Sequence, residues 1–96
     1  MSDMINAAVA ALNEKMGGDG FDGSVKIDIE GEGAIMINED GASAGDGDAD
    51  CTLSASAEVF QSILAGETNA TAAFMGGNLS VDGDMGTAMK LGTILS

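Results

Sequence analysis

The chain of 96 residues is predicted to form a single α+β domain, residues 1–96, built on a five-stranded antiparallel or mixed sheet with its helices packed on one face. Two observations predict this fold. A chain of this length has room for one domain with one core. Its apolar residues alternate with a period of two in a run of short segments, and segments with helical spacing bracket that run.

The first helix is expected to begin at Ser2 or Asp3 and to end at Gly17-Gly18. Its apolar residues recur at intervals of four and three, so one face packs on the sheet while the other is solvated. That apolar face consists of Ile5, Val9, Leu12 and Met16.

Strict alternation predicts a half-buried strand from Ser24 to Glu30. Glu30 to Gly33 reads as a hairpin turn, and Ala34 to Asn38 as the returning strand. In the returning strand Ile35 and Ile37 share one face, which predicts that both point into the core.

The acidic segment Glu39 to Asp50 has two interpretations. Alternating aspartates from Asp46 onward resemble a calcium loop, but an EF-hand needs Gly where Cys51 stands and Glu where Ala57 stands. The favoured alternative is a short edge strand at 42–44 followed by an acidic turn.

The segment after this turn predicts a further strand with Cys51 and Leu53 pointing inward. A buried cysteine without a neighbouring His or Lys is expected to be an inert small hydrophobe. Ser56 is expected to cap a helix that ends at Gly66, followed by a connector or short helical turn. The apolar face of that helix includes Val59, Phe60, Ile63 and Leu64.

The last third of the chain predicts a strand from Leu79 to Val81, a break at Gly83, and a final helix capped by Asp84. That helix has an apolar face and little polar surface. The face comprises Met85, Ala88, Met89, Gly92 and Leu95, widened by Leu91 and Ile94.

Five short motifs succeed one another in this part of the chain. They are Phe74, Gly76 or Gly77, the strand Leu79 to Val81, Gly83-Asp84-Met85-Gly86, and Ala88-Met89-Lys90-Leu91. Their order resembles the sterol carrier protein 2 family, also called the nonspecific lipid-transfer domain. The resemblance implies a sheet and helices that enclose an apolar tunnel, with the last helix as one wall.

Composition and charge exclude several classes of function. Three Lys against sixteen Asp and Glu give a formal charge of -13, so nucleic acid and anionic membranes are not expected as partners. This charge is typical of a highly soluble protein or one adapted to high salt. One Cys and no His exclude an internal disulfide, Cys-His or Ser-His-Asp catalysis and the usual zinc sites. No apolar run approaches the ~20 residues of a membrane span, and no signal peptide is recognisable, so we expect a cytoplasmic protein.

The resemblance implies a noncatalytic protein that needs no cofactor and holds an apolar small molecule: a fatty acid, an acyl thioester or a sterol-like lipid. The residues expected to line its site are Ile35, Ile37, Leu53, Phe60, Ile63, Leu64, Phe74, Met75, Leu79, Val81, Met85, Met89 and Leu95. The alternative is an accessory domain with the same fold and a collapsed core that serves a protein partner. An enzyme using Glu58 or Asp84 as a base is the third hypothesis, although a solvated carboxylate at a helix start is the ordinary role of such residues.

Overall fold

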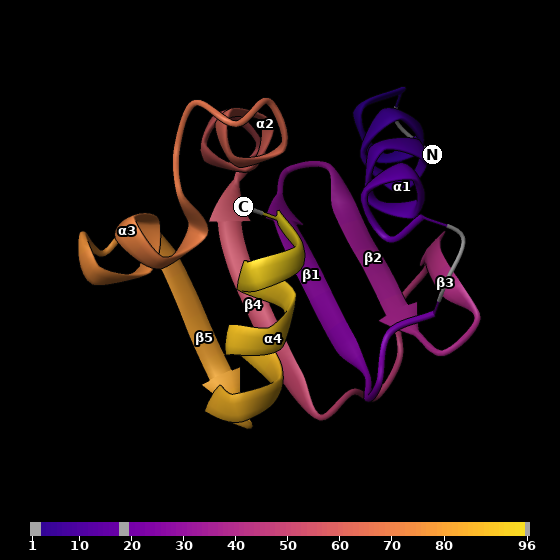
Figure 1. Ribbon diagram of the computed structural model, residues 1–96. Helices are drawn as coiled ribbons and strands as arrows, with labels where there is room; N and C mark the ends of the chain where they lie inside the picture. The colour runs from indigo at the N-terminus through magenta and orange to yellow at the C-terminus, as the bar shows by residue number, and fades with distance from the viewer. Residues whose placement is uncertain (1–2, 18–19, 96) are drawn as a thin grey trace.

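The computed structural model describes residues 3–17 and 20–95 (Figure 1). In chain order its elements are α1 (Asp3–Lys15), β1 (Val25–Glu30), β2 (Gly33–Asn38), β3 (Gly41–Ala44), β4 (Cys51–Ser56), α2 (Ala57–Leu64), α3 (Ala70–Met75), β5 (Leu79–Gly83) and α4 (Met85–Leu95). Each predicted strand is present, and the connector after α2 forms a short helix of its own. The predictions on Ser2 and Gly18 lie outside the described residues.

The five strands form one mixed sheet in the order β3-β2-β1-β4-β5. β1 pairs parallel with β4, and every other neighbouring pair is antiparallel. The register places Ile27 opposite Ile35 on one side and opposite Leu53 on the other. Because side chains alternate along a strand, this register gathers the apolar residues of three strands on one face. The predicted α+β fold with a mixed sheet is confirmed.

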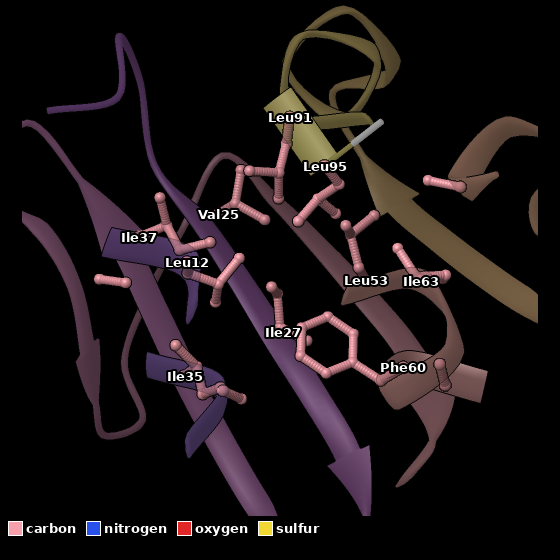
Figure 2. Close-up of a cluster of buried hydrophobic side chains, with 14 of the residues drawn as sticks. Leu12, Val25, Ile27, Ile35, Ile37, Leu53, Phe60, Ile63, Leu91 and Leu95 are labelled. Atoms are coloured by element: carbon pink, nitrogen blue, oxygen red, sulfur yellow. The ribbon is translucent and has the colours of Figure 1, made fainter. Parts of the chain in front are cut away.

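Helices cover that apolar face and leave the opposite face to solvent. Leu12 of α1, Phe60 of α2 and Leu91 of α4 are buried in one core cluster with the strand residues. Figure 2 shows side chains from all three helices converging on the sheet. On the uncovered face, Asp28 of β1 is exposed, and Lys26 is partly exposed. α3 lies beside the edge strand β5 (Figure 1).

Polar side chains cap the N-terminal ends of α2 and α3. The Ser56 side chain accepts a hydrogen bond from the Val59 backbone N–H at 3.2 Å, which confirms it as the cap of α2. Asn69 caps α3 by accepting from the backbone N–H of Thr71 at 2.8 Å. These caps satisfy amide groups that have no partner within the helix.

The edge strand β3 is tied to α1 by one side chain. The Asn13 amide nitrogen donates to the Ala42 carbonyl at 3.0 Å, and its oxygen accepts from the Ala42 N–H at 2.9 Å. Gly41 makes this approach possible, because a Cβ there would stand 2.7 Å from the Asn13 side-chain oxygen, and its φ of +107° favours glycine.

The acidic segment between β3 and β4 is a turn with local partners. Asp46 forms an ion pair with Lys26, which lies on the uncovered face of the sheet. The Asp50 backbone N–H donates to the Ser24 hydroxyl at 2.9 Å, and the Ser24 N–H donates to the Asp50 carboxylate at 3.3 Å. Within residues 3–17 and 20–95, no group of three or more His, Cys, Asp or Glu is placed to hold a metal ion.

None of the helices in the described part of the chain is long and apolar enough to span a membrane.

Candidate functional site

An apolar groove lies between α3, the outer part of the sheet and α4. Its volume is about 200 Å³. Every lining residue is apolar except Thr71, and none is ionisable. The lining residues are Leu53, Ala70, Thr71, Phe74, Met75, Leu79, Val81, Met85, Ala88, Met89, Gly92 and Leu95.

The groove collects the large apolar side chains that the fold leaves in water. Phe74 is 38% exposed, Met75 80%, Met85 43% and Met89 66%, and all four line the groove. Among the described residues these are the exposed large hydrophobic side chains. An apolar patch concentrated at a concave site is typical of a binding surface. The resemblance predicted an enclosed tunnel, whereas this groove is open to solvent at its methionines.

The helix α4 has two apolar faces with different roles. Leu91 is fully buried against the sheet, and Ala88 and Leu95 are also buried. Met85 and Met89 are exposed and line the groove, which the buried Ala88 and Leu95 also border. The sequence predicted one continuous stripe along this helix, and the structure divides it between core and groove.

Asp84 fixes where α4 begins. One carboxylate oxygen accepts from the Gly86 N–H at 3.0 Å, and the other accepts from the Thr87 hydroxyl at 2.9 Å. The Thr87 hydroxyl, followed by the Gly86 N–H, lowers the pKa of Asp84 below its ordinary value. Asp84 is therefore a cap that stays ionised near neutral pH, and a general base needs the opposite shift.

Gly83 sets the separation between β5 and the start of β4. Its φ is +100°, and a Cβ there would stand 2.5 Å from the Asp50 carbonyl oxygen. That carbonyl accepts from the Asp84 N–H at 3.0 Å. Glycine thus allows the chain to turn sharply from the groove floor into α4.

The short helix α3 forms the opposite wall. Its last turn is closed by the Gly77 N–H, which donates to the Phe74 carbonyl at 3.1 Å, and by the Asn78 N–H, which donates to the Ala73 carbonyl at 2.8 Å. Ala73 is buried on the inner side, while Phe74 and Met75 remain exposed. The turn therefore holds Phe74 and Met75 over the groove.

The structure brings together most of the residues predicted for the site. Those that line the groove are Leu53, Phe74, Met75, Leu79, Val81, Met85, Met89 and Leu95. The others lie elsewhere: Ile35, Ile37, Phe60 and Ile63 are fully buried in the core, and Leu64 borders a separate surface groove between α1 and α2. Figure 2 shows Phe60 and Ile63 among the buried hydrophobic side chains of the core.

Four lining residues were absent from the predicted site: Ala70, Thr71, Ala88 and Gly92. Ala88 and Gly92 do fall in the predicted apolar stripe of the last helix. Residues four positions apart lie on the same side of a helix, so the spacing of Ala88 and Gly92 from Met85 and Met89 was the signal available for them. Nothing in the sequence marked Ala70 or Thr71 in the same way.

The thiol of Cys51, which lies near the start of α4, is not activated for chemistry. Cys51 is buried, and burial, followed by the carboxylates of Asp84 and Asp50, raises the pKa of its thiol. A thiol with a raised pKa is a poor nucleophile at neutral pH. Glu58 is exposed in the first turn of α2. The groove is therefore suited to holding apolar groups rather than to acid–base or thiol chemistry.

Comparison with known proteins identifies relatives that match most of this chain in sequence. The chain is 38% identical over 77 residues to hydroxysteroid dehydrogenase-like protein 2 of Danio rerio, which covers 72% of this chain and 19% of that protein. It is 32% identical over 84 residues to sterol carrier protein 2 of Homo sapiens, covering 86% of this chain and 14% of that protein. The chain thus spans less than a fifth of the length of these relatives.

Comparison with solved structures finds the same fold in a sterol carrier protein. The solution structure of sterol carrier protein 2 from Aedes aegypti in complex with palmitate superimposes with a TM-score of 0.76, covering 100% of this chain and 97% of that chain at 17% identity. An identity this low shows likeness of fold alone. The model of the SCP-2 sterol transfer family matches residues 7–96. This match over almost the whole length shows that the chain belongs to the SCP-2 sterol transfer family.

Proposed function

We propose that this chain binds the hydrocarbon part of a lipid in the groove between α3, β5 and α4, without catalysing a reaction. The observation that carries the proposal is the placement of Phe74, Met75, Met85 and Met89, which are left in water and all line one groove. Covering them with a hydrocarbon chain removes apolar surface from water, and each buried methylene of the ligand contributes ~0.8 kcal/mol.

The size of the groove indicates how much of a lipid it accepts. An engineered cavity of ~150 Å³ holds benzene, so a volume of about 200 Å³ corresponds to a hydrocarbon segment on the order of eight carbon atoms. A longer chain requires α3 and α4 to separate. Methionine side chains are unbranched and adaptable, so three of them around the opening suit a wall that reshapes around its ligand.

Family membership supports the same class of ligand. Palmitate is the ligand of the Aedes aegypti protein, whose fold is similar. A fatty acid, an acyl thioester and a sterol-like lipid all present the required apolar body. The cytoplasmic location expected from the sequence stays a prediction.

Palmitate titration of the delipidated protein tests the proposal. Calorimetry in about 150 mM salt, where exposed charges are partly screened, is expected to give saturable binding at one site. Met89→Asp places a charge in the groove and is expected to weaken binding at least about tenfold. Thr93→Asp is the matched control, because it adds the same charge to α4 at an exposed position that does not line the groove. Unchanged binding in Met89→Asp would refute the site.

The accessory protein-interaction domain is the second candidate, and the same exposed methionines favour it, since such side chains are common at adaptable protein-binding surfaces. Native mass spectrometry of the purified protein separates the two. A stoichiometric co-purified lipid supports lipid binding. An apo mass together with no palmitate uptake supports the interaction domain.

A further inference from the structure

The two edges of the sheet differ in what they offer to another chain. At β3, the Asn13 side chain binds both backbone groups of Ala42. β5 forms the opposite edge, and Figure 1 shows α3 at the end where this strand begins. Leu79 is buried at that end, whereas Asp82 and Gly83 are exposed. The edge of β5 is therefore open along the later part of the strand.

The backbone groups that this edge presents follow from one hydrogen bond. The Asp84 N–H donates at 3.0 Å to the carbonyl of Asp50, which immediately precedes β4. Because the peptide bond is trans, the Gly83 carbonyl points the opposite way, out of the sheet. Inward and outward residues alternate along an antiparallel strand, so Val81 also directs its N–H and C=O outward. Among the described residues, these outward groups have no hydrogen-bond partner.

The two faces of the sheet beside this edge differ in chemistry. A strand added to β5 would place its side chains alternately on the two faces. On the face covered by helices they lie beside Val81, which lines the apolar groove. On the uncovered face they lie beside Asp82, which is exposed and forms no ion pair with another described residue. The edge therefore fits a segment in which apolar residues alternate with basic ones.

The charge of the chain favours a basic partner over a second copy. Three Lys stand against sixteen Asp and Glu, so two copies repel each other. β5 is only five residues long and carries the charged Asp82, and both features discourage a strand from pairing with itself. A segment that carries Lys or Arg is attracted by the same charges.

We propose that β5 is a docking edge for an extended basic segment of another protein, which adds to the sheet as an antiparallel sixth strand. Its backbone bonds to Val81 and Gly83, and its basic side chains lie beside Asp82. Antiparallel pairing is the more stable form per residue and continues the pairing of β4 with β5. This inference goes beyond lipid binding, because it concerns the backbone of a sheet edge and not the contents of the groove.

A capped eight-residue peptide of alternating Lys and Val tests this with the full chain at about 0.1 M salt. In the antiparallel arrangement its valines lie opposite Val81, so their N–H groups face β5 and those of the lysines face away. N-methylation of the valines removes hydrogen bonds to the edge and is expected to raise the Kd at least about tenfold. N-methylation of the lysines is the matched control and is expected to leave the Kd within about threefold. Equal effects, the reverse order, or no saturable binding of the parent peptide would overturn the proposal.

Two substitutions in the protein separate docking at β5 from general attraction. Asp82→Asn removes the carboxylate beside the basic side chains and is expected to raise the Kd of the parent peptide about threefold. Asp28→Asn is the matched control, because it removes the same charge from an exposed position on the same face, in the central strand β1. It is expected to change the Kd by less than about 1.5-fold. The same effect from both variants would show attraction without docking.

Amide hydrogen exchange followed by NMR locates the peptide. In the free protein, the N–H groups of Val81 and Gly83 are expected to exchange at least about tenfold faster than those of Ser80 and Asp82, which face β4. The peptide is expected to slow exchange at Val81 at least about tenfold. Faster exchange at Ser80 and Asp82 than at Val81 would contradict the outward groups. Protection of Val81 without peptide, together with a dimer in sedimentation, would make a second copy the occupant and reject the proposed partner.

Discussion

Replacing Gly92 tests both the stability of α4 and the position of the groove. Gly92 lies in the interior of α4, and a Cβ built there meets one atom within 4 Å, the Cβ of Ala70 at 3.9 Å. That distance is an ordinary van der Waals contact, and both residues line the groove. A side chain at position 92 therefore points toward α3 without a clash.

Gly92→Ala is expected to stabilise the protein. Alanine in place of glycine inside a helix contributes about 1 kcal/mol. For a domain of this size that free energy corresponds to a rise in Tm of about 4–8 °C, measured by thermal unfolding followed by circular dichroism. A fall in Tm would contradict the space that the structure shows beside Gly92.

Gly92→Leu is expected to weaken lipid binding by filling the groove. If the leucine displaces roughly three methylenes of the ligand, the loss is ~2.4 kcal/mol, which is about fiftyfold in Kd. Thr93→Leu is the control, because it adds the same side chain one position further along at an exposed site. A Kd for palmitate that stays within about twofold in Gly92→Leu would refute the groove as the binding site.

Three further outcomes follow from other contacts. Ser56→Ala removes the cap of α2 and is expected to lower the unfolding free energy by about 1 kcal/mol in urea titrations, and no change would contradict the bond to the Val59 N–H. The Thr87 hydroxyl lowers the pKa of Asp84 in the folded protein below the unfolded value of 3.8. The stability that this carboxylate contributes is therefore fully present above pH 3.8 and is lost as the pH falls through the lower pKa of the folded state. Asp84→Asn should therefore lessen the loss of stability between neutral pH and about pH 3, whereas identical pH profiles would exclude this contribution. Burial should make Cys51 react with a thiol reagent at pH 8 far more slowly in the native protein than in urea, and equal rates would show that the thiol is accessible.

The strands and helices could be predicted from the sequence because the apolar residues of each element recur with a single period. The alternation of Val25, Ile27 and Ile29 marks a strand with one buried face, and the structure buries all three. The parallel pairing of β1 with β4 was left open, because periodicity defines which face is buried but not which strand lies alongside.

The sequence did not predict how deeply each residue of the candidate site is buried. Phe60 and Met89 both lie on apolar helix faces, yet Phe60 is 1% exposed and Met89 66%. α2 packs over the central strands, whereas the groove side of α4 faces α3, a helix of six residues. The spacing of apolar residues marks the apolar face of a helix but does not reveal how large the element packed against that face is. The prediction therefore did not separate the residues of the core from those of the groove.

The bond between Asn13 and Ala42 has a consequence for self-association. An outer strand ordinarily offers unpaired N–H and C=O groups to a strand from another molecule. The Asn13 amide binds both the N–H and the C=O of Ala42, in the middle of β3. This edge of the sheet therefore offers no continuous row of free backbone groups to a strand of another molecule. We therefore expect that copies of the protein, when concentrated, do not pair along β3, and that the exposed methionines of the groove offer apolar surface for contact instead.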